Sequence, residues 1–160
     1  MPARIQISIS RQTLELIIAE NVSLRYPVST ALAGVGEKEG SGCTPRGKHY
    51  IRACIGSNQP KGAVFVGRRP TGEVYSSELS EQFPERDWIL TRILWLCGLE
   101  KGFNRGGKVD TQRRYIYIHG TPDTEPMGTP RSHGCIRMRN ADLIELFSQV
   151  QPGTPVLIEE

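Results

Sequence analysis

The 160-residue sequence predicts one mainly β domain with a single α-helix near its C-terminus. Short runs in which apolar and polar residues alternate recur along the chain, and a period of two is typical of strands with one buried face. Glycines and prolines, 17 and 11 of them, separate these runs and provide turns between strands. No repeat or linker divides the sequence, and its length suits one domain. We therefore expect residues 1–160 to fold as a single, mainly β domain with long loops.

Three strands are predicted at the N-terminus. Residues 5–9 and 14–18 carry isoleucine or leucine at every second position, and the polar break between them indicates a β-hairpin. A turn leads into a third strand through residues 24–28. The glycine-rich segment 34–42 lacks the spacing and the following helix of a phosphate-binding loop, so we expect a surface loop there, before a strand at 50–54.

The segment 57–87 is rich in glycine and proline. We expect one short strand in it, at residues 63–66. Long irregular stretches in compact domains are often functional, so this segment is a candidate lid over a substrate. The adjacent Arg68 and Arg69 have two interpretations, contact with a substrate carboxylate or an exposed solvated pair, and the second is favoured.

The C-terminal half holds the densest apolar run, residues 88–99, which fits a strand or a helix by periodicity alone. Further on, Asn140 is a good N-cap for a helix over about residues 140–150. A last strand is predicted at 156–158. The apolar face of the predicted helix consists of Leu143, Ile144, Phe147 and Val150.

The segment from Tyr115 to Met138 concentrates the reactive side chains. It holds two of the three histidines, His119 and His133, together with Cys135. In an extended strand Tyr115, Tyr117 and His119 point to one face. The proline-rich loop 121–131 is expected to turn the chain back, so that His119 and Cys135 come close together.

A thiol near an imidazole suits nucleophilic acyl transfer. Free cysteine has a pKa near ~8.5, so a nearby imidazole is needed to activate it. His119 is the candidate base, and the N–H groups of Gly134 and Cys135 are candidates for an oxyanion hole. Two other interpretations remain open: a buried structural cysteine beside unrelated histidines, or a metal site formed by Cys135, His133 and His119. No close pair of ligands completes a zinc set.

Two strings in this segment carry a resemblance: His-Gly-Thr at 119–121 and Ser-His-Gly-Cys-Ile-Arg-Met at 132–138. Together they resemble the active-site signature of the L,D-transpeptidase catalytic domain, the YkuD family. Residues 26–30, 44–47 and 49–51 resemble the upstream part of that domain, and residues 140–147 and 153–156 its C-terminal end. Most of the chain is therefore covered by the resemblance.

The resemblance implies a YkuD-like β-sandwich or barrel with long active-site loops, and it favours a strand at 88–99. It also implies a cysteine enzyme that acts on peptidoglycan stem peptides, with no metal or other cofactor. By position, Cys135 is the nucleophile and His119 the base, while the carbonyl of Gly120 orients the base and His133 is a second histidine near the thiol. Which histidine is the better base stays open.

Three further residues are candidates for substrate contact. Tyr117 shares the face of His119, and Ser132 precedes the nucleophile. Arg137 lies on the nucleophile's own face if that segment is extended. It is a candidate for holding the terminal carboxylate of a substrate, and a structural role in bracing the loop 121–131 is equally open.

Composition sets the expected location and partners. A net charge of +3 without a Lys/Arg-rich run argues against nucleic acid as a partner, and no stretch approaches the ~20 apolar residues of a membrane helix. The N-terminus shows no signal peptide, and free cysteines suit a reducing compartment. We therefore expect a cytoplasmic protein, or a periplasmic one if an export signal has been removed. The oligomeric state is open.

The implied chemistry begins with attack of the cysteine on the carbonyl of the diamino acid at position three of the stem, so that D-alanine leaves. Water as acceptor gives an L,D-carboxypeptidase acting on tetrapeptides or muropeptides in murein recycling, and the cytoplasmic expectation favours this outcome. An amine as acceptor gives an L,D-transpeptidase that forms 3-3 cross-links or exchanges D-amino acids. A third alternative is an inactive domain that binds peptidoglycan peptides.

Overall fold

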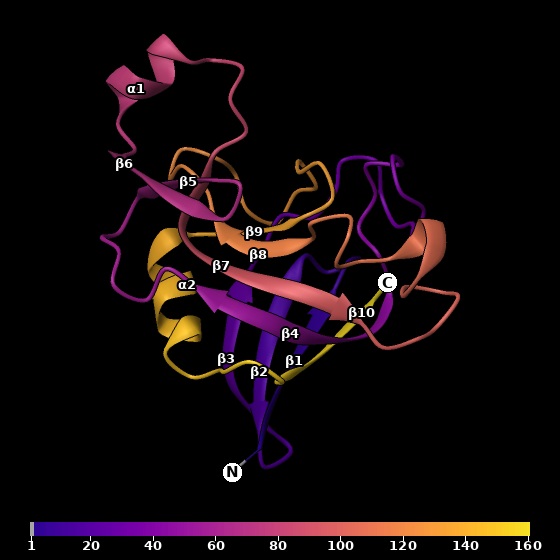
Figure 1. The fold of residues 1–160 in the computed structure, drawn as a ribbon. Helices are drawn as coiled ribbons and strands as arrows, with labels where there is room; N and C mark the ends of the chain where they lie inside the picture. Colours follow the sequence, from indigo (N-terminus) through magenta and orange to yellow (C-terminus); the bar gives the residue numbers. More distant parts are fainter. Residues whose placement is uncertain (1) are drawn as a thin grey trace.

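The computed structural model describes residues 2–160, and the predicted mainly β fold is confirmed. Within these residues ten strands form one mixed sheet in the order β3-β2-β1-β10-β4-β7-β5-β6, and β8 joins it between β7 and β9 (Figure 1). Two neighbouring pairs are parallel, β1 with β10 and β8 with β9. The strands are β1 Ala3–Ser8, β2 Thr13–Ile18, β3 Asn21–Pro27, β4 Gly47–Ile55, β5 Ala63–Val66, β6 Arg69–Val74, β7 Ile89–Gly98, β8 Tyr117–Gly120, β9 Ile136–Met138 and β10 Pro155–Glu159.

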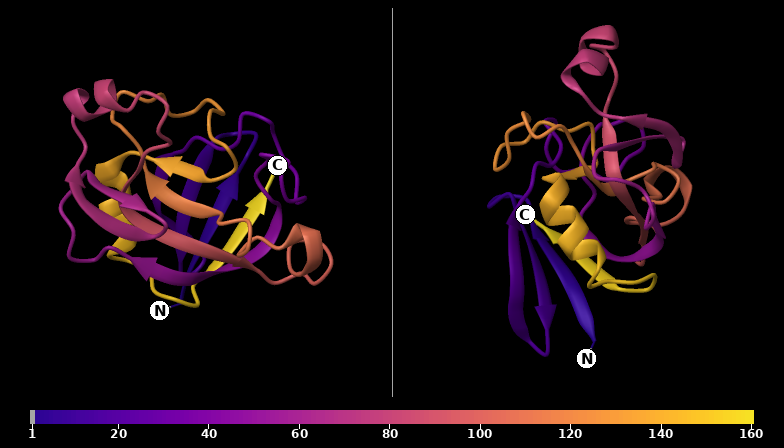
Figure 2. Two further views of the ribbon diagram at one scale, coloured as in Figure 1. Left: turned by 45° about the horizontal axis from the view of Figure 1, so that its top comes forward. Right: turned by 90° about the vertical axis from the view of Figure 1, so that its left-hand side faces the viewer.

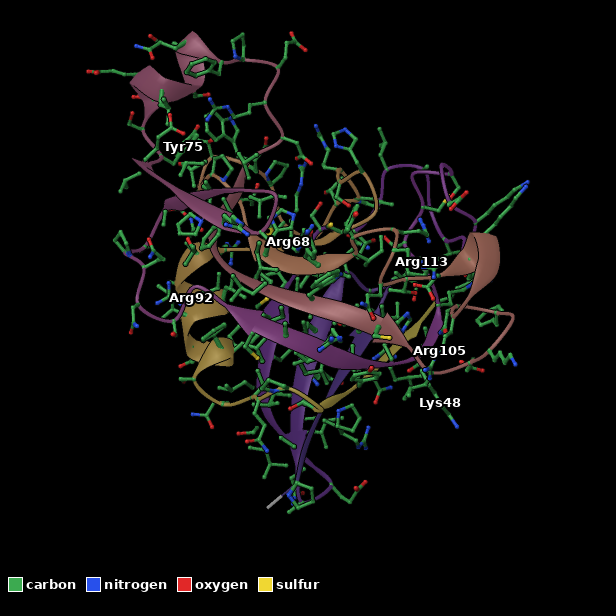
Figure 3. The ribbon with its side chains drawn as sticks, viewed as in Figure 1. Lys48, Arg68, Tyr75, Arg92, Arg105 and Arg113 are labelled. Carbon is green, nitrogen blue, oxygen red and sulfur yellow. The ribbon has the colours of Figure 1, made fainter. Side chains whose placement is uncertain are left out.

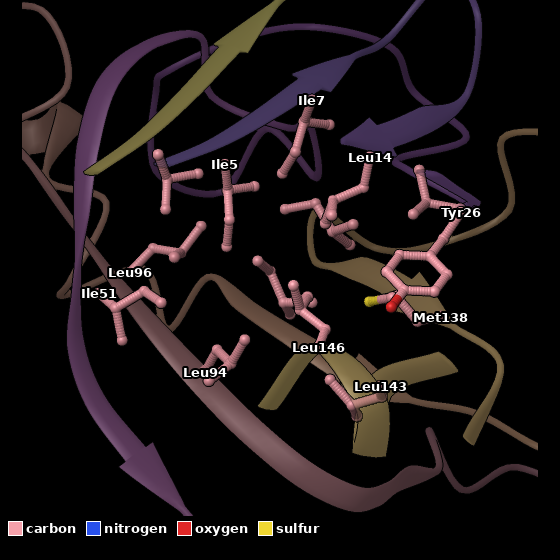
Figure 4. Close-up of a cluster of buried hydrophobic side chains, with 14 of the residues drawn as sticks. Ile5, Ile7, Leu14, Tyr26, Ile51, Leu94, Leu96, Met138, Leu143 and Leu146 are labelled. Atoms are coloured by element: carbon pink, nitrogen blue, oxygen red, sulfur yellow. The ribbon is translucent and has the colours of Figure 1, made fainter. Parts of the chain in front are cut away.

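The sheet curls around one main core. Strands β1 to β3 form one side and strands β4, β7 and β8 the other, with helix α2 (Asn140–Phe147) at an open end between them (Figure 2). In Figure 4, Ile5 and Leu14 face Leu94 and Leu96 across this core, and Leu143 enters it from the helix. The predicted N-terminal hairpin, the third strand and the closing strand are confirmed. The run at 88–99 is a strand, β7, as the resemblance favours.

Helix α2 differs from the prediction at its start and on its apolar face. Arg139, not Asn140, is the N-cap residue, and the buried residues of the helix include Leu146 rather than Ile144. The Asn140 side chain is itself buried: it donates to the Thr121 carbonyl at 2.9 Å and accepts from the Thr91 hydroxyl at 2.5 Å. The asparagine therefore ties the helix to β7 and to the loop after β8.

The segment 57–87 is more regular than the sequence predicts. The strand at 63–66 is confirmed as β5, but it pairs with a second strand, β6, and is followed by a short helix, α1 (Ser77–Gln82). The sequence signal for α1 is Ser76, whose hydroxyl accepts a hydrogen bond from the Leu79 N–H at 3.1 Å. Figures 1 and 2 show α1 projecting from the body of the molecule.

Strand β8 is shorter than the alternating pattern predicts. It begins at Tyr117, and Tyr115 lies in the preceding turn with a φ of 56°. Strand β7 has an irregularity opposite β8, where Thr91 has a φ of 76°. A positive φ is rare for a β-branched residue and signals local strain. No helix within residues 2–160 is long and apolar enough to cross a membrane.

Candidate active site

The parallel pair β8 and β9 places the reactive residues. In its register Ile118 lies opposite Ile136 and His119 opposite Arg137, while Cys135 immediately precedes β9. Both His119 and Cys135 line a cavity of about 420 Å³. Its other walls come from the β5–β6 hairpin, from the start of β7 and from residues 114–117. The histidine and cysteine that the sequence singles out are thus brought into one cavity.

His119 has a defined tautomer. Its side chain is buried, and its Nδ1 lies 2.6 Å from the carbonyl oxygen of Gly120. Because a carbonyl only accepts hydrogen bonds, Nδ1 carries the proton and Nε2 is left with a free lone pair. Burial lowers the pKa of His119, and the Gly120 carbonyl offsets this only in part. His119 is therefore a neutral imidazole whose Nε2 can accept a proton.

Gly120 has no room for a side chain. A Cβ atom there would lie 2.6 Å from the Leu90 carbonyl oxygen and even closer to the side-chain oxygen of Asn140. Such contacts do not occur in folded proteins without a shift of the backbone. The glycine thus lets the carbonyl that holds His119 sit against β7 and the buried Asn140.

Cys135 is held by backbone groups on both sides of its sulfur. The Tyr117 N–H donates to Sγ at 3.3 Å, and the thiol donates to the Tyr115 carbonyl at 3.4 Å. Burial raises the pKa of the thiol to about 12, while the Tyr117 N–H and the nearby Arg137 and Arg114 partly oppose this effect. Cys135 is therefore a neutral thiol and His119 a neutral imidazole, so any reaction of the sulfur as a thiolate requires its proton to move.

The turn before Cys135 is held by Ser132. Its hydroxyl donates to the Cys135 carbonyl at 2.5 Å and accepts from the Gly134 N–H at 3.2 Å. The Gly134 carbonyl in turn accepts from the Thr44 hydroxyl at 2.9 Å. Two predictions change as a result. Ser132 is 2% exposed and positions the turn instead of offering its hydroxyl to a substrate. The Gly134 N–H is already bonded, which leaves the Cys135 N–H as the remaining donor of the predicted oxyanion pair.

His133 and Arg137 share one carboxylate, Asp87. The Nη2 of Arg137 lies 3.3 Å from Asp87 Oδ1, and the Nδ1 of His133 lies 3.6 Å from Asp87 Oδ2. Arg137 is largely buried, whereas the His133 side chain is 76% exposed. Arg137 therefore lines the cavity with its charge already partnered, and His133 stands at the cavity mouth without the fixed tautomer of His119.

The profile of the YkuD L,D-transpeptidase catalytic domain matches residues 2–158. The chain belongs to this family. Among curated relatives, two Bacillus subtilis proteins provisionally named L,D-transpeptidases are similar over shorter stretches. YqjB is 42% identical over 59 residues, which cover 37% of this chain and 32% of YqjB, and YkuD is 48% identical over 46 residues, which cover 29% and 28%. The matched part thus spans about a third or less of these relatives.

Solved structures of L,D-transpeptidases share the fold. The catalytic domain of the Enterococcus faecium enzyme, acylated by ertapenem, superposes with a TM-score of 0.56 at 18% identity and covers 99% of this chain and 98% of that one. The Mycobacterium smegmatis enzyme gives 0.56 at 16% identity over 99% of this chain and 59% of that one. At such low identity the likeness establishes the YkuD fold and nothing finer.

Several residues of this YkuD-family cavity were not singled out as site residues by the sequence. Asp87 and Arg114 line it, and Arg68, which the sequence favours as solvated, forms part of its wall. Asp87 ends a segment without a recognisable pattern, and its partners lie about fifty residues further on. Arg69 is exposed as expected. Within residues 2–160 no group of three or more His, Cys, Asp or Glu side chains is arranged to hold a metal ion.

The raised thiol pKa leads to a direct test. The rate at which iodoacetamide alkylates Cys135 should keep rising with pH up to at least pH 10, because the reactive thiolate is scarce below a pKa of about 12. The tryptic peptide spanning residues 132–137 reports this cysteine alone by mass spectrometry. A small thiol with a pKa near ~8.5 should level off in the same series. If instead the alkylation rate of Cys135 levelled off, with the midpoint of its rise below pH 8, Cys135 would be a preformed thiolate.

Proposed function

We propose that this domain is a cysteine acyl transferase that acts on peptidoglycan stem peptides, with Cys135 as the nucleophile and His119 as the general base. The observation that carries the proposal is the shared cavity, in which the Gly120 carbonyl holds the proton of His119 on Nδ1 and leaves Nε2 free. Membership of the YkuD family supports the substrate class.

The reaction follows from this arrangement. Cys135 Sγ attacks the carbonyl of the diamino acid at position three, and its proton passes to His119 Nε2. The Cys135 N–H stabilises the oxyanion of the tetrahedral intermediate. When the C–N bond breaks, the proton on Nε2 moves to the departing amine of D-alanine and a thioester remains. The neutral starting pair suits this sequence, since the same proton is taken up and then returned.

We further propose that water resolves the thioester, so that the domain trims tetrapeptides or muropeptides as an L,D-carboxypeptidase in the cytoplasm. The observation in favour is that all four cysteines are free thiols, the state that a reducing compartment maintains. Soluble peptides recovered for recycling are the stem peptides present there.

A second candidate, transpeptidation, is favoured by the shape of the site. A further cavity, lined by Glu39 and Arg113, adjoins the first, and the two share Arg114, Ile116 and His133 as lining residues. That space suits an amine-bearing acceptor stem that reaches the thioester from the side of His133.

Mass spectrometry of products distinguishes the two outcomes. The protein is incubated with a disaccharide-tetrapeptide, with and without an excess of a second stem or a free D-amino acid. Hydrolysis predicts loss of one D-alanine and tripeptide as the product in both mixtures. Dimers or exchanged stems would favour transpeptidation and would argue against the recycling role. An unchanged substrate in both mixtures would contradict the proposed activity itself.

A further inference from the structure

Arg68 stands out among the arginines that line the cavity. Arg137 is paired with Asp87, and the guanidinium of Arg114 donates to the backbone carbonyls of Gly36, Glu37 and Cys43. In the described part of the chain, Arg68 is the cavity arginine with neither a carboxylate nor a backbone carbonyl as partner. Its side chain is half-buried, and Arg68 lines the cavity that holds Cys135.

The guanidinium of Arg68 is held in place by aromatic rings. It lies 4.8 Å from the ring centroid of Trp95 and 4.8 Å from that of Tyr115, and its Nη1 donates to the Tyr117 hydroxyl at 3.1 Å. Figure 3 shows Arg68 where the β5–β6 hairpin approaches strand β8. Stacking on ring faces uses none of the five N–H donors, and the tyrosine uses one. A rigid planar fork with free donors is therefore presented on the wall of the cavity that also contains Cys135.

The backbone at Arg68 is also unusual. The hairpin between β5 and β6 has a two-residue loop, Gly67 and Arg68, with φ values of 57° and 64°. Positive φ at both positions is typical of a type I′ turn, in which glycine or asparagine is preferred. A long arginine in this conformation carries a backbone cost, and such strain is often retained at functional sites.

We propose that Arg68 determines substrate specificity by binding a carboxylate of the acyl donor in a two-pronged hydrogen bond. A planar guanidinium matches the two oxygens of a carboxylate, and an unpaired cation in a partly enclosed cavity favours an anionic ligand. A tetrapeptide stem offers two such groups near the reacting carbonyl, the side-chain carboxylate of the diamino acid and the terminal carboxylate of D-alanine. The inference rests on the proposed function.

Matched acid and amide substrates test the inference. One tetrapeptide has its side-chain carboxylate converted to a carboxamide, a second has its terminal carboxylate converted, and a third is unmodified. D-alanine release, as free acid or amide, gives kcat/KM for each with wild type, Arg68→Met and Arg69→Met. We expect wild type to lose about 10- to 100-fold on one of the amides, the usual value of a charge-assisted hydrogen bond. Arg68→Met should have the same kcat/KM for the acid as for that amide. The exposed Arg69→Met should keep the wild-type ratio of kcat/KM between the acid and the amide.

The possible outcomes distinguish failure of the Arg68 inference from failure of the proposed function. The amide on which wild type has the lower kcat/KM identifies which carboxylate Arg68 binds. If Arg68→Met slows acid and amide by the same factor, or if wild type does not discriminate between them, the inference is overturned. If Arg68→Met does not fold, Arg68→Gly replaces it, because glycine suits the positive φ of the hairpin. Wild type that releases no D-alanine from any substrate would overturn the proposed function, and this inference with it.

Discussion

Replacing Cys135 by alanine should abolish turnover on a stem tetrapeptide while leaving the fold intact. We expect kcat/KM to fall by at least about 10⁴-fold, because removal of the nucleophile leaves no route to a thioester. The sulfur makes two weak backbone hydrogen bonds and lies at the cavity wall outside the main core, so its loss should have little effect on stability.

The measurement combines D-alanine release with the intact mass of the protein during turnover. Wild type should show a transient acyl adduct that Cys135→Ala lacks. Cys43→Ala is the matched control, since Cys43 is also partly exposed but does not line the cavity. If Cys135→Ala and Cys43→Ala proved equally active, the assignment of Cys135 as the nucleophile would be contradicted. A folded Cys135→Ala with wild-type thermal stability would show that the loss is chemical.

Local patterns in the sequence predicted much of this fold. The alternation at residues 5–9 and 14–18 identified the hairpin, because a half-buried strand requires that period. The strings around His119 and Cys135 identified some of the residues that line the cavity, among them His119, His133 and Cys135. Tyr115 shows where a local pattern misleads: it continues the alternation of β8, yet it lies in a turn with a positive φ and stacks on Arg68 instead.

Pairings between distant segments account for what the sequence missed. Asn140 satisfies every local criterion for a helix cap, but it is buried because Thr91 and Thr121 approach it from elsewhere in the chain. Asp87 and Arg68 belong to a segment without periodicity, and their roles depend on contacts with Arg137 and Tyr117. Hydrogen-bond partners of this kind follow from the packing of strands, which periodicity does not specify.

Changing His119 to glutamine should have the second largest effect. We expect kcat to fall by about 10²–10⁴-fold, the usual range for loss of a general base, because glutamine does not replace the proton acceptor Nε2. Glutamine preserves much of the volume, and its amide offers a donor to the Gly120 carbonyl, so the buried site should remain packed. His133→Gln is the matched control. His133 is exposed at the cavity mouth and lies 3.6 Å from Asp87, so its replacement should cost less than about 10-fold.

The pH dependence of kcat/KM tests the same assignment in wild type. Protonated His119 cannot accept a proton, so activity should be lost as pH falls through the pKa of His119. Burial lowers that pKa, and the acid limb should therefore lie below the ordinary histidine value of ~6.5. An acid limb at or above that value, together with a larger loss in His133→Gln than in His119→Gln, would assign the base to the exposed histidine. An acid limb of wild type that lies below this histidine value, and that is missing from the pH profile of the residual activity of His119→Gln, would show that the buried imidazole accepts the proton from Cys135.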